Sequence, residues 1–434
     1  MRDSKKAWIV AVDMGHGHQR AAEPLLPIAY GGEVITANNY DGIPASDKAI
    51  WGQSKKFYYF ISSLHEKGAP GRLAFRAFDY FQKIDDFYPR KEQIQPPFQL
   101  KEIYSLIKGG WGRHLIKKLG ENPVPLVTTF FTVAFMAEYW KYPGPLYAVV
   151  TDSDVSRAWA SLSPKSSRIN YFAPTARVVK RLESYGVPQD RIIHTGFTLP
   201  LELLGQNLAV AKDNLAKRIA NLDPAGVYKE RYAPIIRKYL GTRSAVPSPV
   251  SLSFVVGGAG AQSGIGMNLI SSLKELIKQN KLRLNLLAGI HRGVVQNFNW
   301  AIDRAGLRNY LGKSIFVITA GNKADYFKLF NQTLFNTDIL WSKPSELSFY
   351  AALGMPLVIA PPIGSQEIKN REWLQFNCVA IDQLHPLYAH EWLPDFISSG
   401  RLAEAAMEGF IKLEKQGTEN IIKHITQRGM NYEV

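Results

Sequence analysis

Cysteine is almost absent from this chain, because Cys378 is the only one among 434 residues. A single thiol excludes internal disulfides and any metal cluster built from cysteines, and it fits a reducing compartment. No stretch reaches the roughly 18–20 apolar residues that a membrane-spanning helix needs. The first apolar run is interrupted at Asp13, too early for the core of a signal peptide. We therefore expect a cytoplasmic protein, and a peripheral position on the inner face of the membrane stays open.

Acidic residues are few relative to basic ones. The chain has 52 Lys and Arg against 37 Asp and Glu, a formal net charge of +15. This balance favours anionic partners: nucleic acid, an anionic membrane surface or a phosphorylated ligand. No nucleic-acid recognition motif accompanies the charge, so nucleic acid is not an expected partner. A hydrophobic content of 46% and a charged content of 21% are those of a folded protein, and the length allows two or three domains.

Short apolar runs alternate with helical patterns along most of the chain. In the first half the runs that resemble buried strands are 7–12, 33–37, 124–129, 146–151, 169–173 and 191–196. In the second half they are 252–256, 284–288, 315–319, 338–342 and 357–360. Strands that alternate with helices indicate doubly wound parallel sheets. The fold class predicted from the chain is therefore α/β, with two Rossmann-like doubly wound domains.

The boundaries follow from changes in composition. We expect one Rossmann-like domain over 1–204 and a second over 250–395. Between them, 205–249 has two helical patterns and a stretch rich in Ser and Pro, which indicate a helical insertion and linker. The last segment, 396–434, is expected to form helices.

Two glycine-rich loops follow predicted strands. The first, Asp13-Met14-Gly15-His16-Gly17-His18, opens a helix, and glycines there let the backbone approach a ligand. A tight turn with a surface histidine is the plain alternative, and without a carboxylate or cysteine cluster nearby we expect no metal. The second loop runs from Gly257 to Gly264. Ser263 stands where the dinucleotide fingerprint needs its third glycine, which argues against a nicotinamide enzyme.

Other strand ends carry polar or charged residues. Asp152 and Asp154 form an Asp-x-Asp triplet that could hold a divalent metal, but an Asp that orients a loop is the favoured interpretation. His291 and Arg292 follow another strand, and Arg292 either pairs with phosphate or is a surface charge. In 336–370, two strand ends and two helix starts converge on one edge of a sheet, where anions bind. Ser345 is the expected cap of the first of these helices.

These motifs resemble those of GT-B glycosyltransferases, in particular diacylglycerol galactosyl- and glucosyltransferases and peptidoglycan N-acetylglucosaminyltransferases. The matching positions are Asp13, Gly15, Gly17, His18, Pro174-Thr175, Gly186-Val187-Pro188, Ile192, Thr195-Gly196, Asp338, Lys343-Pro344, Gly354-Met355-Pro356, Gln366-Glu367 and Asn370. The resemblance implies an acceptor-side domain over 1–204 and a nucleotide-sugar-binding domain over 250–395, which face a cleft, and C-terminal helices in 396–434 that pack back on the first domain. It also implies a UDP-sugar donor, inversion at the anomeric carbon, and no cofactor or obligatory metal.

The same resemblance assigns roles to residues. His18 or Asp13 is the candidate base, with Asp152 in reserve, and Gly15, His16 and Gly17 form the acceptor-side loop. The expected donor-binding residues are Gly258, Gly260, Gln262, Ser263, His291, Arg292, Lys343, Ser345, Glu346, Gln366, Glu367 and Asn370. One departure is clear. Phe349 stands near the position of a Glu that binds ribose in the family, and Glu346 is the only local substitute.

The segment 48–118 is basic and aromatic, with 14 Lys or Arg against 6 Asp or Glu. A helix with an aromatic inner face and a solvated basic outer face explains this composition. The alternative is a surface that lies on anionic lipid, with Phe and Trp at the interface. In the resembled family the acceptor lipids enter through this half.

The favoured function is transfer of a sugar from a UDP-sugar to a lipid or other hydrophobic acceptor at the membrane surface. One alternative is a non-hydrolysing UDP-sugar epimerase on the same fold. The other is a catalytically inactive protein that only binds nucleotide sugars, for which the missing ribose Glu is the best argument.

Overall fold

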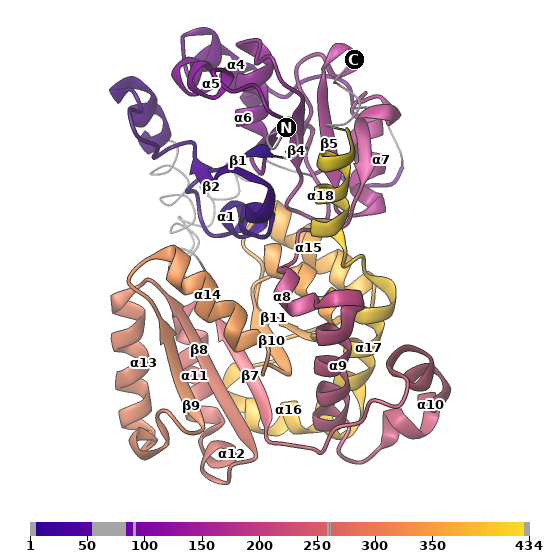
Figure 1. Ribbon diagram of the computed structural model, residues 1–434. Helices are drawn as coiled ribbons and strands as arrows, with labels where there is room; N and C mark the ends of the chain where they lie inside the picture. The colour runs from indigo at the N-terminus through magenta and orange to yellow at the C-terminus, as the bar shows by residue number, and fades with distance from the viewer. Residues whose placement is uncertain (1–5, 54–83, 90–92, 258–259, 261, 429–434) are drawn as a thin grey trace. The chain divides into compact units, whose positions relative to one another are not determined.

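The structure is a computed structural model that describes residues 6–53, 84–89, 93–257, 260 and 262–428 (Figure 1). Within these ranges no helix has both the length and the apolar character that crossing a bilayer requires. The chain divides into two compact units. Unit 1 comprises Met1–Leu199, Ile363–Asn370 and Glu414–Val434. Unit 2 comprises Pro200–Pro362 and Arg371–Leu413.

Unit 1 is built on a six-stranded parallel sheet with the order β2-β1-β3-β4-β5-β6. The strands are β1 (Ala7–Ala11), β2 (Ala29–Thr36), β3 (Leu126–Thr128), β4 (Leu146–Val149), β5 (Ile169–Ala173) and β6 (Ile192–His194). The helices include α1 (Gly17–Ala22), η1 (Glu23–Ile28), α4 (Phe98–Lys108), α5 (Arg113–Gly120), α6 (Phe131–Tyr139), α7 (Ala176–Ser184) and α18 (Gly417–Arg428).

Strand β1 shows why the strands of this sheet are apolar throughout. Ile9 and Ala11 pack against α1, η1 and α18 on one face, whereas Val10 packs with α4, α5, α6 and α7 on the other. Successive side chains of a strand point to opposite faces, so a strand covered on both sides is apolar at every position. The resulting continuous run is the signal that predicted the strand.

Unit 2 has a second six-stranded parallel sheet, with the order β12-β11-β10-β7-β8-β9. Its strands are β7 (Val250–Val255), β8 (Leu282–Gly289), β9 (Ile315–Thr319), β10 (Ile339–Ser342), β11 (Leu357–Ile359) and β12 (Ala380–Asp382). Its helices include α8 (Leu201–Leu204), α9 (Ala209–Leu222), α10 (Val227–Leu240), α11 (Ser263–Ser272), α12 (Lys274–Lys278), α13 (Arg292–Arg304), α14 (Lys323–Leu334), η7 (Glu346–Leu353), α16 (Ala389–Ser398) and α17 (Arg401–Lys412). Helix α15 (Ser365–Phe376) begins in unit 1 and ends in unit 2.

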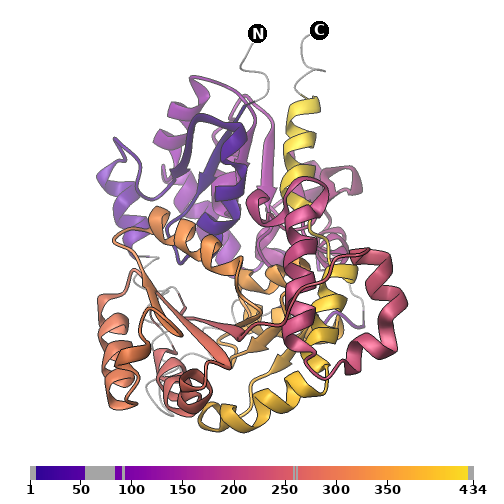
Figure 2. The ribbon, with the colours of Figure 1, turned by 60° about the horizontal axis from the view of Figure 1, so that its bottom comes forward.

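The segment predicted as an insertion and linker is part of the core of unit 2. Leu215, Ile219 and Leu222 of α9 are buried in the same apolar cluster as Leu402 and Phe410 of α17. Figures 1 and 2 show α9 alongside α17, with α10 on their outer side. Helix α9 is therefore a layer of the fold rather than a spacer.

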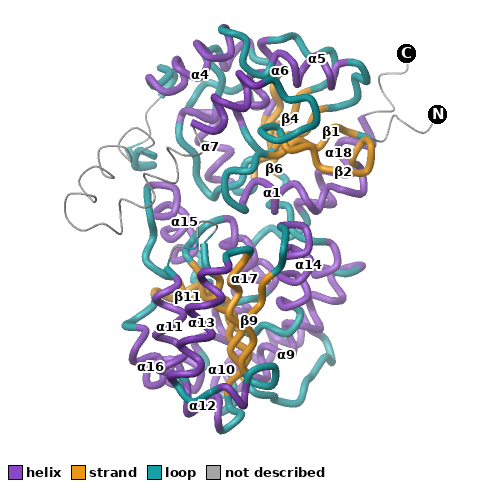
Figure 3. Tube along the Cα trace, turned by 90° about the vertical axis from the view of Figure 1, so that its left-hand side faces the viewer, coloured by secondary structure: helices purple, strands orange, loops and turns teal. Residues whose placement is uncertain are grey.

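Each sheet is wound in two directions. In unit 1 the chain passes from β1 to β2 on one side and then to β3 on the other side of β1, and in unit 2 the same reversal lies between β7 and β10. Figure 3 shows the strands of each unit in orange between purple helices. Both units thus have the doubly wound, Rossmann-like α/β fold that the sequence predicts, and such folds bind ligands at the reversal.

A close backbone crossing ties α18 to the end of β6. A Cβ added to Gly417 would lie 2.2 Å from the carbonyl oxygen of Phe197 and 2.5 Å from that of Gly196. Backbone atoms cannot move aside as a flexible side chain can. Thr418 adds a hydrogen bond of 2.6 Å from Oγ1 to the carbonyl of Leu199.

We predict that Gly417→Ala lowers the free energy of unfolding by about 2 kcal/mol or more, because the crossing must open to admit the methyl group. The matched control is Gly293→Ala on α13, where the added Cβ meets nothing within 4 Å. The control is expected to be neutral or slightly stabilising. Urea unfolding of both variants checks this, and equal stabilities would show that the crossing tolerates a side chain.

Candidate functional site

The loop after β1 lies at the carboxyl edge of unit 1, at the β1–β3 reversal. Asn38, which follows β2, clamps its backbone, since Oδ1 accepts from the Asp13 N–H at 2.8 Å and Nδ2 donates to the Asp13 carbonyl at 3.2 Å. Gly15 has a φ of +88°, a conformation that favours glycine. His16 is buried at 8% exposure, and Gly17 opens α1. Helix α1 has only six residues, so it does not carry an anion site by itself.

His18 is held by two hydrogen bonds with the end of β3. Its Nδ1 lies 2.8 Å from the carbonyl oxygen of Thr129, and the Thr129 hydroxyl donates to the His18 carbonyl at 2.9 Å. The Phe130 ring packs edge-on against the imidazole, with centroids 4.8 Å apart. A carbonyl oxygen can only accept, so Nδ1 carries the proton, and in the neutral ring Nε2 is then the basic nitrogen. This tautomer is the one that a general base needs.

Asp152 follows β4 at the same edge and is bonded to the segment 363–370. Asn370, fully buried, donates from Nδ2 to Asp152 Oδ1 at 3.1 Å. Its Oδ1 accepts from the backbone N–H and the hydroxyl of Ser153, at 2.9 and 2.7 Å. The structure thus brings Asn370 and Asp152, which the sequence assigns to different domains, into one hydrogen-bonded group within unit 1.

The start of α15 has further anchors in unit 1. Ser365 Oγ accepts from the backbone N–H of Ile84 at 3.0 Å. Glu367, almost fully buried, accepts from the N–H of Ile363 at 2.7 Å and so caps its own helix. Gln366 is partly exposed, and its side chain makes no hydrogen bond within the described residues. Of this pair, Gln366 is therefore the side chain more available to a ligand.

Asp154, the second carboxylate of the Asp-x-Asp triplet, has a structural role. It is 1% exposed and accepts from Arg181 Nε at 2.8 Å and from the backbone N–H of Val155 at 2.9 Å. A buried guanidinium that neutralises the carboxylate leaves it unsuited to a metal ion. No cluster of three or more His, Cys, Asp or Glu positioned for a metal occurs in the part of the chain that the structure describes.

The glycine loop of unit 2 lies at the β7–β10 reversal. Gly258 falls outside the described residues, whereas Gly257 and Gly260 are joined by a backbone hydrogen bond of 2.8 Å. Lys343, directly after β10, lies against Gly257, because a Cβ added there would be 3.0 Å from Lys343 Cε. The loop leads into α11, a ten-residue helix whose first residue is Ser263. A cation and the start of a helix thus adjoin the same loop, a combination that favours anions.

Gln262 anchors the glycine loop to the next strand end. With a φ of +66° it precedes α11, and its Nε2 donates to the carbonyl of Pro361 at 2.9 Å. His291 is also near the loop, since a Cβ on Gly260 would lie 3.8 Å from its Cγ. Arg292 is exposed at the first turn of α13. The loops after β7, β8 and β11 thus lie close together at the carboxyl edge of unit 2.

The turn after β10 contains the expected helix cap, Ser345, and is followed by a helix that carries Phe349. Ser345 caps η7 through its side chain, which accepts from the Leu347 N–H. Glu346 is partly exposed at the start of this helix. Phe349 is 2% exposed and packs on the ring of Trp373 at 5.2 Å, so the position that should carry a ribose-binding Glu faces the core of unit 2.

Asp338 lies at the opposite end of β10 from the site. Its Oδ2 accepts from the backbone N–H of Ser251 at 2.8 Å and from Asn221 at 2.9 Å, and it is 4% exposed. Arg218, 3% exposed beside it, donates to the carbonyls of Thr337 and Leu353 at 2.8 Å. This motif residue holds α9 to the sheet and does not reach a ligand.

Three residues at these edges have no role in the sequence analysis. Asn38 and Thr129 fix the histidine loop, and the strand-end rule could have indicated both, since Asn38 follows the predicted strand 33–37 and Thr129 is the last residue of the predicted strand 124–129. Gly266 permits close packing of α11, because a Cβ there would lie 2.6 Å from the ring of Phe298. The glycine that allows close packing here is therefore within α11, three residues beyond Ser263.

A family model described as a domain of unknown function (DUF6938) matches residues 241–370, and no curated protein matches the chain. A structure of MnaA with UDP from S. aureus is 13% identical and covers 76% of this chain and 82% of its own, with a TM-score of 0.47. A UDP-GlcNAc 2-epimerase from Neisseria meningitidis bound to UDP-GlcNAc is 17% identical, and the match covers 80% of this chain and 86% of the epimerase, with a TM-score of 0.43. MurG of Acinetobacter baumannii is 12% identical, and the match covers 85% of this chain and 95% of MurG, with a TM-score of 0.44.

We predict an unusual pH dependence of stability from Asp338. Burial raises the pKa of this carboxyl from 3.8 to about 6. Because the native state binds this proton more tightly than the unfolded chain does, the protonated carboxyl contributes to stability. The contribution is complete at pH values below the ordinary pKa and is lost as the pH rises through about 6. Asp338→Asn has no carboxyl to titrate, so it does not lose this contribution. The free energy of unfolding of the variant minus that of wild type should therefore increase from pH 4 to pH 6.5, by up to about 3 kcal/mol.

Urea unfolding at several pH values measures this difference. Asp395→Asn on α16 is the control, because its side chain is exposed and the substitution should give a constant offset. A pH-independent offset for Asp338→Asn as well would show that the buried carboxyl does not titrate in this range.

Proposed function

We propose that the protein is a glycosyltransferase that moves a sugar from a UDP-sugar to a hydrophobic or lipid acceptor, with inversion. The observation that supports this best is Lys343 against Gly257, at the reversal of the unit 2 sheet and beside the start of α11. A nucleoside diphosphate that leaves a sugar carries the charge that this arrangement favours.

The proposed reaction needs a base for the acceptor hydroxyl. His18 Nε2 takes the proton, the acceptor oxygen forms a bond to the anomeric carbon, and the bond from that carbon to the diphosphate breaks with its electron pair going to UDP. The hydrogen bond from Nδ1 to Thr129 supports this role, because it orients the ring and fixes the tautomer. Gln366 is proposed to bind sugar hydroxyls, which would give selectivity among epimers.

The proposal of a lipid acceptor is based on the exposed side chains of α4 and α5. Helices α4 and α5 expose Lys101, Lys108, Arg113, Lys117 and Lys118. Phe98 is 67% exposed and Leu106 42% exposed on α4, so apolar side chains accompany the charges. Trp111, expected at the lipid interface, is instead buried at 4% beside Trp51. The predicted aromatic run in 54–83 lies outside the described residues. Exposed basic and apolar groups on the same two helices are the combination that favours binding to anionic lipid.

We predict that His18→Ala lowers turnover of UDP-sugar with an active acceptor by about 10²–10⁴-fold, the usual contribution of a general base. The melting temperature and its increase with UDP should persist. His194→Ala, at an exposed histidine of β6, is the control and should keep full turnover. Unchanged turnover in His18→Ala would remove this residue from the mechanism. Epimerised product from UDP-N-acetylglucosamine alone would favour the epimerase instead.

We predict that Lys343→Met weakens UDP binding by roughly 10–100-fold, because a charged hydrogen-bond donor to the diphosphate is lost. Isothermal titration measures the affinity, and uridine, which lacks phosphate, should show a far smaller effect. Lys274→Met on α12 is the matched control at an exposed lysine. An equal loss of affinity for uridine and UDP would mean that Lys343 acts through the fold and not on phosphate.

A further inference from the structure

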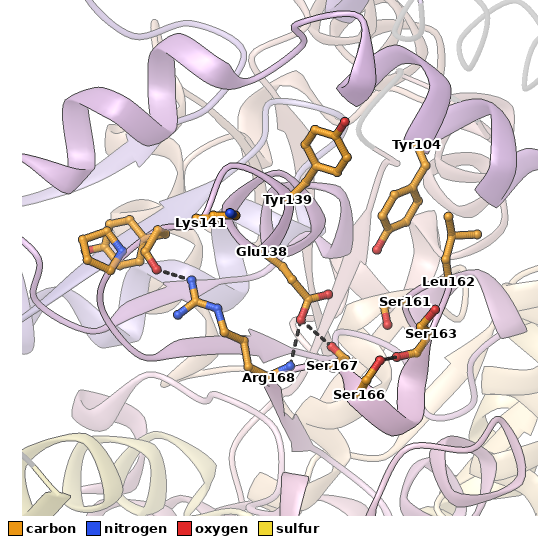
Figure 4. A pocket seen from close by; sticks show the side chains of 12 residues that line it. Tyr104, Glu138, Tyr139, Lys141, Ser161, Leu162, Ser163, Ser166, Ser167 and Arg168 are labelled. Carbon is orange, nitrogen blue, oxygen red and sulfur yellow. Dashed lines mark hydrogen bonds between the residues drawn. The ribbon is translucent and has the colours of Figure 1, made fainter.

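Unit 1 has a concave site at the edge of its sheet opposite His18. A cavity of about 700 Å³ lies between α4, the end of α6, the turn before β4 and the loop before β5 (Figure 4). These last two segments, 141–143 and 161–168, directly precede the strands. All strands of the sheet are parallel, so the cavity lies at their amino ends, whereas Asp152 and His18 lie at the carboxyl ends. Its volume is in the range of small-molecule sites.

Two polar groups of the cavity have hydrogen-bonding capacity that the described residues do not use. Ser161 is 2% exposed, and its Oγ has no hydrogen-bond partner. Glu138 uses only Oε1, which accepts from Ser167 Oγ and from the backbone N–H of Arg168, both at 2.8 Å. In Figure 4 the second oxygen of Glu138, the hydroxyl of Tyr104 and Ser161 turn toward the same space. A buried hydroxyl without a partner costs about 1–3 kcal/mol, which a ligand could recover.

Tyr104 completes this polar group as a donor. Burial raises the pKa of its hydroxyl, so the proton stays on the oxygen. The Leu162 backbone N–H and the Ser161 hydroxyl lie beside this oxygen and act against the rise in its pKa. The three side chains therefore offer a hydroxyl donor, a carboxylate acceptor and a hydroxyl that can do both.

The charges around the cavity restrict what can bind. Lys141 lines it, and the Glu138 carboxylate opposes that positive charge. The Arg168 guanidinium is directed at the turn, where it donates to the carbonyls of Tyr142 and Gly144. A phosphate dianion would meet the carboxylate, and a cationic amine would meet the lysine. Neutral groups that both donate and accept, as sugar hydroxyls do, suit the set, and the exposed Tyr139 ring offers an apolar face.

The turn that lines one side of the cavity has an unusual and anchored backbone. Lys141 has a φ of +53°, a conformation that few residues other than glycine adopt. The Tyr142 hydroxyl donates to the Val124 carbonyl at 2.5 Å, which fixes the turn beside it. Strained backbone that its surroundings hold in place is a feature of ligand sites. We propose that this cavity is a binding site for a neutral sugar, separate from the proposed transferase site, with Glu138, Ser161 and Tyr104 as its hydrogen-bonding residues.

The test uses the full chain and neutral sugar probes. N-acetylglucosamine, glucose and maltose are titrated at millimolar concentrations and followed by saturation-transfer NMR and calorimetry, with choline and inorganic phosphate as charged probes. At least one sugar should bind, and neither charged probe should compete with it. Ser161→Ala should reduce the affinity about fivefold, the value of one hydrogen bond, and leave the melting temperature unchanged, since Oγ has no partner to lose.

Glu138→Gln tests the carboxylate without emptying its position. The amide oxygen can still accept from Ser167, but the charge is lost, so we expect at least a tenfold weaker sugar affinity. Ser105→Ala, at an exposed serine of α4 outside the cavity, should bind as wild type does. The proposal is overturned if no sugar binds, if choline or phosphate displaces the bound sugar, or if Ser161→Ala and Glu138→Gln both retain the wild-type affinity.

Discussion

The reversal of winding within each parallel sheet is the constraint on which the functional part of this protein depends. Loops that leave the two central strands run to opposite faces of the sheet, so their ends stay apart at the carboxyl edge and leave room for a ligand. In unit 1 this place holds the loop 13–18, and in unit 2 it holds the glycine loop after β7 and Lys343 after β10. The residues with the clearest chemistry in the chain thus lie where the fold cannot fill space with its own helices.

Hydrogen bonds to backbone give these loops their definition. His18 has its ring orientation from the Thr129 carbonyl, and Asn38 holds the backbone of Asp13 from a third strand end. Asn370 likewise holds the backbone of Ser153, by accepting a hydrogen bond from its N–H. In each case a side chain bonds peptide groups that no sheet or helix satisfies, so the cost of leaving them buried and unpaired is avoided. The polar residues around a site therefore need as definite an identity as those that point into it, because each holds one particular peptide group.

Several carboxylates that resemble site residues in the sequence are structural. Asp154 neutralises Arg181, Asp338 joins Ser251 to Asn221, and Glu367 caps its own helix. Burial separates these from Asp152, which stays partly exposed at the end of β4. A residue type and a spacing do not distinguish the two classes, because the deciding quantity is whether another buried group already uses the carboxylate oxygens.

The sequence by itself determined the doubly wound fold, since strands covered on both faces must be apolar throughout, as Ala7–Ala11 is, and the runs between them have helical spacing. It also determined which strand ends carry His18, Asp152, Gly257 and Lys343. The short strand β12 was not predicted, because a brief apolar run does not distinguish a helix from a strand. Only the tertiary structure decided that Asn370 bonds to Asp152, that Phe349 faces the core, that α9 belongs to unit 2, and that Ser161 and Glu138 line one cavity. These are contacts between residues far apart in the chain, and local periodicity carries no information about them.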